Sequence, residues 1–561
     1  MNSADLASLE TRGDLAYRSI LTYGRLEGKW YKPWEVFSAD INGWPGDWEG
    51  RIILALTLMA QATHRPPAFL DDILAACPAH FNDKGYFGQI CRPGLVHEQQ
   101  LSGHSWFLRG LVEYYRWKKD ESVRAMIETV ARNLLLPAQD NYACYPIDPA
   151  DRQAARENPT AWELSHFQSK SKTHAETVDT GCGFIMLDGA TAAYELLGWP
   201  ELKELIGVMI DRFRQIDLAA THVQTHATLT ATRGILRFYE LTGERGYLEL
   251  GRSIYDLYRT TAWTEHYCNY NWFGQPRWTE PCAIIDSYIV STWLWRLTAE
   301  SRYLEDAHHI YYNGIAHAHR ASGCFGTDYC LGARDPFLRP KTYEVYWCCT
   351  MRGGELFEKA HEFCYFTDGD VLTFAQYHDW TGTVGFASGE VRLRMDTGYP
   401  YDGTVRLSVS ASASRAKHRL RFFAPPWTRP QACVVKLNGA KTASALRDGF
   451  IECETALAAG DRLELDMGVF FRAVDTVNAS SLAGCHSFRH GPMILATDTG
   501  EELYVGRDAV FEPEPSGRAR YRFKETQIVF APINDTENLT LADHNRQALF
   551  RADDGRFALK Y

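Results

Sequence analysis

Two adjacent cysteines, Cys348 and Cys349, are the residues whose types and spacing point most directly to chemistry. They follow the aromatic pair Tyr346-Trp347 and precede Arg352 and two glycines. Neighbouring residues of a helix or strand point in different directions, so both sulfur atoms can reach one point only from a bend in the chain. The glycines permit such a bend. Two thiolates usually converge on a soft metal ion, and a tetrahedral site then needs two more ligands.

The motif Glu280-Pro281-Cys282 can supply those two ligands. Proline is favoured where a helix begins, and a helical pattern follows over residues 284–297. Side chains two apart diverge within a helix, but they can converge from its first turn. Glu280 and Cys282, with Cys348 and Cys349, would make a set of three sulfurs and one oxygen that suits Zn²⁺. The competing interpretation is that these cysteines are small core residues.

Three other residues are candidates for contact with a substrate. Glu265 lies in an aromatic loop, and a carboxyl group among aromatic rings tends to have a raised pKa, which suits a general acid. A solvated loop glutamate is the alternative. His104 and His226 lie where helical patterns begin, and each could equally be a capping or core histidine.

Length and composition limit the class of protein. A chain of 561 residues exceeds the size of a single core, so we expect several domains. Aromatic residues, at 13%, suit sugar-binding clefts and large cores alike. The net charge of −11 disfavours nucleic acid as a partner. The sequence contains no secretory signal pattern and no long apolar run, and its 14 cysteines are scattered. We therefore expect a cytoplasmic protein with free thiols.

Helical periodicity dominates the first two-thirds of the chain. Apolar residues recur at helical spacing over residues 51–62, 105–117, 123–135, 184–197, 202–216, 229–241, 247–258, 284–297 and 307–319. Several of these patterns form helical hairpins, as where Tyr239-Glu240-Leu241 is followed after a short turn by Tyr247-Leu248-Glu249. Helical hairpins joined by long, variable connections predict a closed ring, the (α/α)6 barrel. Long loops at one end of such a ring would carry the site.

The period changes from helical to alternating near residue 367. Alternation over residues 391–395, 404–409, 419–423, 433–437 and 462–466, with turn motifs between, predicts a β-sandwich. Weaker strand patterns follow at 521–524 and 527–531. We predict a multidomain α+β protein, with an N-terminal (α/α)6 barrel over 1–366, a β-sandwich over 367–473, and a second smaller sandwich or extension over 474–561.

These motifs together resemble glycoside hydrolase family 127, the β-L-arabinofuranosidase-like proteins formerly grouped as a domain of unknown function. The most specific match is Glu280-x-Cys282 followed by Cys348-Cys349. Further matching segments extend along nearly the whole chain, among them Gly103-His104 and the stretches 397–403 and 489–492.

The resemblance implies a zinc-dependent retaining glycosidase. It assigns Zn²⁺ to Glu280, Cys282, Cys348 and Cys349, and makes Cys348 the nucleophile, which a bound metal ion would keep deprotonated. Glu265 would be the acid/base, first protonating the leaving oxygen and then activating water. By the same resemblance, His104 and His226 would hydrogen-bond to sugar hydroxyls.

Three positions depart from the family pattern and concern the sugar. Tyr346 stands where a further cysteine is frequent, and Thr350-Met351-Arg352 stands where Pro-x-Asn is usual. Asp179-Thr180-Gly181 lies where a sugar-binding histidine usually opens the middle helix pair. We interpret Tyr346 and Arg352 as substrate contacts, with Arg352 able to bind the carboxylate of an acidic sugar. A surface arginine is the alternative.

We therefore expect an exo-acting glycosidase that releases a terminal β-L-arabinofuranose or a related sugar, acidic sugars included. An (α/α)6 sugar isomerase or epimerase is one alternative, although it leaves the cysteine motifs and the sandwich unexplained. A non-catalytic carbohydrate-binding protein with a structural zinc site is another. The expected partner is an oligosaccharide or small glycoside, with no nucleic acid and no membrane. Whether the protein forms a homodimer stays open.

Overall fold

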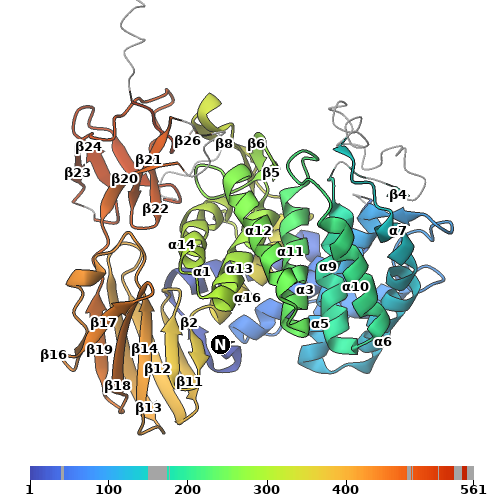
Figure 1. Ribbon diagram of the computed structural model, residues 1–561, viewed down its shortest axis with the longest axis horizontal. Coiled ribbons are helices and arrows are strands. Elements are labelled where there is room, and N and C mark those ends of the chain that lie inside the picture. Colours follow the sequence, from blue (N-terminus) through green and yellow to red (C-terminus); the bar gives the residue numbers. More distant parts are fainter. Residues whose placement is uncertain are drawn as a thin grey trace, which may run out of the picture.

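A computed structural model describes residues 1–38, 43–149, 174–175, 177, 179–476, 482, 484–515, 517–535 and 546–552. Helices form one large body, and two β-rich modules lie beside it, one coloured orange and one red in Figure 1. The fold class predicted from the sequence, a helical barrel followed by β-sheet modules, is confirmed.

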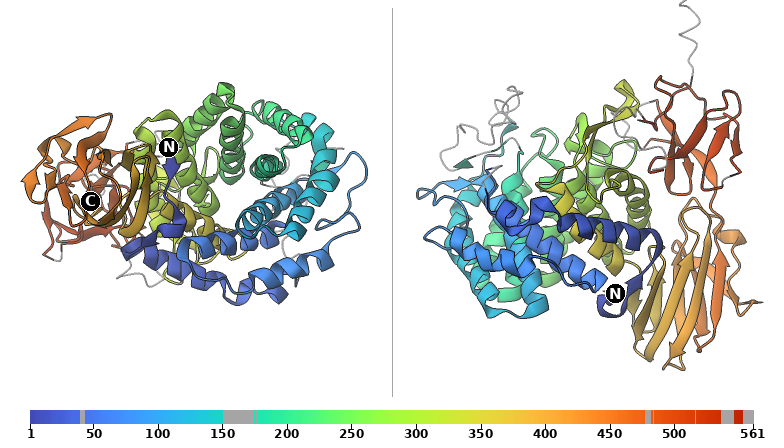
Figure 2. Two further views of the ribbon diagram at one scale, coloured as in Figure 1. Left: turned by 90° about the horizontal axis from the view of Figure 1, so that it is seen from below. Right: turned by 180° about the vertical axis from the view of Figure 1, so that it is seen from behind.

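The helical body is a double ring. Its inner helices are α3 (Asp47–Thr63), α5 (Glu98–Lys118), α9 (Met186–Leu197), α11 (Thr225–Thr242), α13 (Pro281–Thr298) and α16 (Cys349–Glu362). Each packs against the next, and α16 packs against α3, which closes the ring seen in Figure 2 (left). The outer helices of the described residues are α1 (Gly13–Leu26), α4 (Leu70–Ala76), α6 (Glu121–Val130), α10 (Pro200–Phe213), α12 (Arg245–Thr261) and α14 (Arg302–His309). Shorter segments include α2 (Pro33–Val36), α7 (Gln139–Ala143), α15 (Ala316–Ala318) and the π-helical turns Ala131–Leu135 and Ile310–Ile315.

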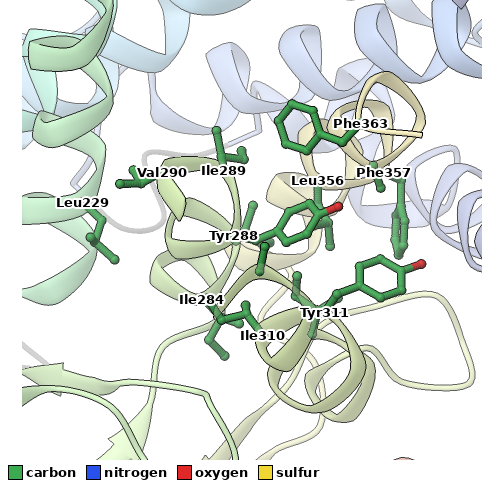
Figure 3. Packing of buried hydrophobic residues seen from close by; sticks show 14 of the residues in the cluster. Leu229, Ile284, Tyr288, Ile289, Val290, Ile310, Tyr311, Leu356, Phe357 and Phe363 are labelled. Carbon is green, nitrogen blue, oxygen red and sulfur yellow. The ribbon is translucent and has the colours of Figure 1, made fainter. Parts of the chain in front are cut away.

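Inner and outer helices differ in how much of their surface is buried. The outer helix α12 buries one stripe, including Leu248, Ile254 and Tyr258, as expected for an amphipathic helix. The inner helix α13 is buried on nearly every side. Figure 3 shows Ile284 and Tyr288 of α13 in this core, close to Leu356 and other side chains of α16. Burial on nearly all sides, of polar as well as apolar side chains, therefore marks the helices of the inner ring.

Glycines allow the inner helices to cross closely. A Cβ atom on Gly50 of α3 would lie 2.1 Å from the backbone nitrogen of Phe107 in α5. A Cβ atom on Gly234 of α11 would lie 2.4 Å from the backbone carbon of Leu187 in α9. Since such distances are impossible for real atoms, a side chain at either position would force two helices of the ring apart.

The middle β module consists of two packed sheets. The six-stranded sheet has the order β1 (Asn2–Ser3), β9 (Phe366–Asp368), β10 (Val371–Phe374), β14 (Lys417–Phe423), β18 (Phe450–Ala456) and β17 (Ser444–Arg447). The seven-stranded sheet has the order β16 (Ala440–Lys441), β15 (Lys436–Leu437), β19 (Arg462–Asp466), β13 (Thr404–Ser412), β12 (Gly389–Thr397), β11 (Trp380–Phe386) and β2 (Glu10–Thr11). Strands β1 and β2 come from the N-terminus, so the sandwich is built from both ends of the barrel sequence.

Four of the five strands expected in this module lie within β12, β13, β14 and β19. The expected strand over 433–437 is mostly wrong, because only Lys436 and Leu437 pair with neighbours. Residues 433–435 belong to no strand, and residues 430–432 just before them form a tight helical turn. Alternating side chains alone do not make a strand where no neighbouring backbone is in register.

The last β module is a six-stranded sheet of order β20 (Phe471–Asp475), β21 (His486–His490), β22 (Met493–Ala496), β25 (Val529–Pro532), β24 (Tyr521–Phe523) and β23 (Phe511–Pro513). Its small core includes Phe488, Phe530 and Phe550. The two weak strand patterns seen in the sequence correspond to β24 and most of β25.

A further sheet lies at one end of the barrel, and we call it the roof sheet. Its strands are β26 (Arg546–Gln547), β8 (Phe337–Thr342), β7 (Thr327–Tyr329), β6 (Gln275–Thr279) and β5 (Tyr270–Trp272), in that order. Strands β5 and β6 precede α13, and β7 and β8 precede α16. A parallel pair, β3 (Val96–His97) with β4 (His174–Ala175), lies before α5 and α9. The long connections therefore precede the inner helices.

No helix in the described ranges is long and apolar enough to cross a membrane.

The glycine contacts predict opposite effects for two alanine substitutions. Gly234→Ala should destabilise the barrel by about 1–3 kcal/mol, because the added methyl group has no space between α9 and α11. Gly207→Ala, in the outer helix α10 where no atom lies within 4 Å of the new Cβ, should stabilise it by about 0.5–1 kcal/mol. Differential scanning calorimetry should show their midpoints moving in opposite directions. A raised midpoint for Gly234→Ala would contradict the close crossing.

Candidate active site and metal centre

The N-terminal ends of the inner helices surround a cavity of about 530 Å³. Its wall includes aromatic rings, four carboxyl groups and several cationic side chains. Residues that line it include Asp47, Trp48, Glu49, Arg51, Asp179, His226, Trp272, Trp278, Glu280, Lys341, Trp347 and Cys348. A helix N-terminus carries a partial positive charge, so this end of the ring favours anionic groups.

The four predicted metal ligands meet at one side of this cavity, and we call them the thiol cluster. Glu280 and Cys282 lie at the start of α13, and Cys348 and Cys349 lie at the start of α16. The Sγ atom of Cys349 is 3.4 Å from that of Cys348, 3.5 Å from that of Cys282 and 3.3 Å from Glu280 Oε1. All four ligand atoms lie within 4.8 Å of one another. The convergence expected from two separate motifs is therefore observed.

The thiols of the cluster differ in acidity. Hydrogen bonds from the Cys282 and Cys349 thiols lower the pKa of Cys348 to about 6. Burial raises the pKa of Cys282 to about 11 and that of Cys349 well above its usual range. Arg51 adds a positive charge nearby, with its Nη1 atom 3.7 Å from Cys282 Sγ. Cys348 is half-buried and lines the cavity, so the most acidic thiol is also one that a substrate can reach.

The donor set fits a zinc ion. Three sulfurs and one carboxylate oxygen are ligands that Zn²⁺ accepts in tetrahedral geometry, which places sulfur atoms about 3.7 Å apart. The two sulfur–sulfur distances in the cluster, 3.4 and 3.5 Å, are close to that value. In the absence of a cation, burial favours the protonated forms of Glu280 and Cys349. A bound cation would allow all four groups to ionise.

His226, predicted as a sugar contact, lines the cavity near the thiol cluster. Its Nδ1 atom lies 3.0 Å from Asp286 Oδ2, and its ring stacks on Trp106 at 5.7 Å. Asp286 therefore sets the orientation of the imidazole, and Trp106 supports its face. The position suits the predicted contact, whose role stays a prediction.

Arg352, predicted to bind the carboxylate of an acidic sugar, is not among the residues that line the cavity, so its position does not favour that role, which stays a prediction. The side chain is 1% exposed and donates to Asp286 and Glu355. Its guanidinium also lies 4.4 Å from the centre of the Trp106 ring. One turn into α16, it points to the barrel axis rather than to the mouth. A carboxylate in the cavity would find this cation already paired.

His104 and Tyr346 also have structural partners within the protein. His104 is fully buried, with Nδ1 2.7 Å from the carbonyl oxygen of Gln100 and Nε2 accepting from the backbone N–H of Phe87 at 3.1 Å. Tyr346 stacks on Trp30 with ring centres 4.6 Å apart. Neither residue is among those that line the cavity. These positions do not favour a direct contact with a substrate, and the two roles stay predictions.

Glu265, predicted as the acid/base, lies behind the cavity wall. It is 3% exposed and does not line the cavity. Its Oε2 atom accepts a hydrogen bond from the thiol of Cys330 at 3.0 Å. Burial raises its pKa, as expected for a carboxyl group among aromatic residues. The raised pKa of Glu265 agrees with the predicted role of a general acid. Its position behind the wall is unfavourable for proton transfer to a substrate in the cavity.

Asp179 is a cavity residue that sequence reasoning passed over. It lies in the turn before α9, where its carbonyl oxygen accepts from the N–H of Cys182 at 3.0 Å, and its half-buried side chain lines the cavity. Burial, with the charges of Glu98 and Cys282, raises its pKa to about 7. The sequence offered one indication, because an acidic residue stands where a histidine was expected.

Beneath the cavity, charged side chains from five inner helices form an axis network, which we define as Arg109, Asp188, Arg233, Asp286, Arg352 and Glu355. Burial alone would raise the pKa of Asp286, but Arg352 and Arg233 hold it well below its usual range. Arg233 donates to Asp286 at 2.8 Å and also to Glu355. The ion pairs thus join α11, α13 and α16 directly below the thiol cluster.

We expect Asp286→Asn to destabilise the protein by about 3–5 kcal/mol, because it leaves buried guanidinium groups without a full counter-charge. The matched control is Glu454→Gln, which removes an exposed partner of Arg419 and should cost at most about 1 kcal/mol. Thermal unfolding of both variants against the parent protein measures the difference. Equal midpoints would show that the axis network contributes little.

One segment of the chain matches a known protein family. Residues 374–469 match the family described as "Beta-L-arabinofuranosidase, GH127 middle domain". The search of curated proteins found no match.

Solved structures resemble the chain over its full length. A GH127 beta-arabinofuranosidase has a TM-score of 0.72 at 12% identity, with 98% of each chain covered. A GH127 beta-L-arabinofuranosidase from Geobacillus stearothermophilus T6 has a TM-score of 0.70 at 14% identity, covering 97% of this chain and 100% of that one. Another glycoside hydrolase has a TM-score of 0.70 at 15% identity, covering 98% of this chain and 97% of that one. Residues 374–469 are thus similar to the middle domain of glycoside hydrolase family 127, and the whole chain shares its fold with solved structures of that family.

Proposed function

We propose that this protein is a zinc-dependent retaining exo-glycosidase whose nucleophile is Cys348, and that it releases a terminal β-L-arabinofuranose or a related sugar. The observation that carries the proposal is the thiol cluster at the wall of an aromatic cavity, with its most acidic thiol exposed to that cavity. The family match supports a glycoside substrate. The roof sheet supports an exo mode, because it contributes cavity-lining residues above the helix ends and favours binding of a chain end.

The cavity contains the groups that sugar binding requires. Trp272 and Trp278 offer apolar faces from the roof sheet. Their ring centres are 4.8 Å apart, and their ring planes meet at 72°. His226 and Arg51 offer hydrogen-bond donors from the barrel side. Lys341 also lines the cavity, with its Nζ atom 4.7 Å from the centre of the Trp278 ring. If the sugar is acidic, Lys341, rather than Arg352, would bind its carboxylate.

Zinc, when bound by Glu280, Cys282, Cys348 and Cys349, would hold the cluster thiols as thiolates at neutral pH. In the first step, Cys348 Sγ attacks the anomeric carbon. A carbon–sulfur bond forms as the bond to the leaving oxygen breaks, and an acid donates a proton to that oxygen. In the second step, the resulting carboxylate takes a proton from water. The water oxygen then attacks the same carbon and releases Cys348.

We assign the acid/base role to Asp179 instead of Glu265. The carboxyl groups lining the cavity are Asp47, Glu49, Asp179 and Glu280. Asp47 pairs with Arg51 at 2.7 Å, and Glu280 belongs to the thiol cluster. Asp179 is favoured over Glu49 because its pKa, about 7, suits a group that must give and then take a proton near neutral pH.

A cytoplasmic location stays part of the proposal. Three thiols with neighbouring sulfurs 3.4 and 3.5 Å apart need a reducing compartment to remain available as ligands and nucleophile.

We expect Cys348→Ser to lower kcat on aryl L-arabinofuranosides by at least about 1,000-fold, because a serine hydroxyl is a far weaker nucleophile than a thiolate. Cys144→Ser, which changes an exposed thiol far from the cluster in sequence, is the matched control. The substrate panel should include uronic-type sugars. Full activity in Cys348→Ser would remove the nucleophile assignment, and zinc binding without hydrolysis of any glycoside would favour a structural zinc site.

The Asp179 assignment predicts a pH dependence. A raised carboxyl pKa means that the protonated, donating form is present below about pH 7, so kcat on poor leaving groups should fall as pH rises through that value. Asp179→Asn should abolish this dependence, slow poor leaving groups most, and regain turnover of activated aryl glycosides with azide. Glu265→Gln should show none of these three effects. The reverse pattern would restore the sequence-based assignment of Glu265.

A further inference from the structure

A second group of metal-binding side chains lies behind the cavity wall. We infer that Glu265, His266 and Cys330 form a separate site for a divalent cation of borderline softness, of which Zn²⁺ is the best match. The three offer one ligand atom each, and these atoms lie within 4.8 Å of one another. Glu265 and His266 precede the roof strand β5, whereas Cys330 directly follows β7.

Two ligand atoms at this place have no partner of their own. Glu265 Oε1 and His266 Nε2 are buried, and no hydrogen-bond partner for either exists among the described residues. The two side chains are 3% and 0% exposed. A buried polar atom without a partner costs free energy comparable to a lost hydrogen bond, and such atoms call for an ion or water. Two of them, on adjacent residues and beside a thiol, are explained together by one cation.

The orientation of His266 suits a ligand. Its Nδ1 atom lies 3.1 Å from the hydroxyl oxygen of Thr264, which leaves Nε2 as the unpartnered atom. Metal-binding histidines commonly bond one ring nitrogen to a neighbouring polar group and present the other to the ion. Nitrogen, oxygen and sulfur donors together are a set that zinc accepts, and three protein ligands leave one coordination position open.

Charge balance favours a divalent ion. With the Cys330 thiol and the Glu265 carboxyl ionised, the two residues carry two negative charges. Arg320 could otherwise balance them, but it donates to Asp328 at 2.9 Å. His317, whose ring centre is 5.3 Å from that of His266, lies 3.4 Å from the same aspartate.

A simpler interpretation is a protonated glutamate and a thiol that share a hydrogen bond. The 3.0 Å contact between Cys330 Sγ and Glu265 Oε2 agrees with it. That interpretation accounts for two of the three side chains and leaves Glu265 Oε1 and His266 Nε2 unsatisfied. The cation accounts for all three. Because the site joins β7 to the loop before β5, the cation would hold the roof sheet over the cavity, distinct from any part in the reaction.

Metal stoichiometry tests the inference. Protein loaded with zinc and freed of excess metal is measured by inductively coupled plasma mass spectrometry. We expect two equivalents in the parent protein, one in Cys330→Ser, one in Cys282→Ser and none in the double variant. Cys364→Ser is the control, because this buried thiol bonds only to the carbonyl oxygen of Ala360 among the described residues and should keep two.

Cobalt provides a second readout on the same variants. The Co²⁺-loaded parent protein should show sulfur-to-cobalt absorption from both sites, and Cys330→Ser and His266→Ala should each lose the smaller part of it. One equivalent in the parent, retained in Cys330→Ser, would overturn the second site. One equivalent that Cys330→Ser abolishes and Cys282→Ser retains would support the second site and remove zinc from the proposed mechanism.

Discussion

Everything at the active end of this protein depends on one buried carboxylate, Asp286. It accepts hydrogen bonds from Arg233 and Thr230, pairs with Arg352, and lies against His226. These contacts join α11, α13 and α16 through buried side chains, where an unpaired charge would cost several kcal/mol. The ends of α13 and α16 are therefore held in register, and those ends carry the thiol cluster. The ion pairs below the cavity determine the geometry within it.

The double ring explains why the site lies where it does. Inner helices packed side by side present all their N-termini at one end, where partial positive charges favour thiolates and carboxylates. Long connections precede the same helices, and they carry the roof sheet and its tryptophans. The N-termini and the long connections lie at the same end because all inner helices run in the same direction. The cavity has anion-stabilising walls on the barrel side and apolar faces on the roof side, an arrangement suited to a polar sugar ring with one reactive carbon.

The two cysteine-containing groups illustrate different uses of burial. In the thiol cluster, Cys348 stays half-exposed and its pKa is lowered by neighbouring thiols. At Glu265, His266 and Cys330, every side chain is buried and burial raises the pKa of the thiol well above its usual range. The first arrangement leaves a sulfur available to a substrate. The second suits only a tightly held ion or a network of neutral groups. Exposure, more than residue type, separates the catalytic proposal from the structural one.

The sequence by itself determined the helical ring, the β modules and the four residues of the thiol cluster. Periodicity specifies local structure, and a cluster of thiols has few purposes other than metal binding. These features can therefore be predicted from the sequence. Only the tertiary structure decided which polar residues face the cavity. His104 and Arg352 lie on inner helices, yet the packing turns both toward backbone or counter-charges. Asp179 reaches the cavity from a turn whose position depends on α9 and α11. The direction of a side chain is set by contacts far away in sequence, which no local pattern records.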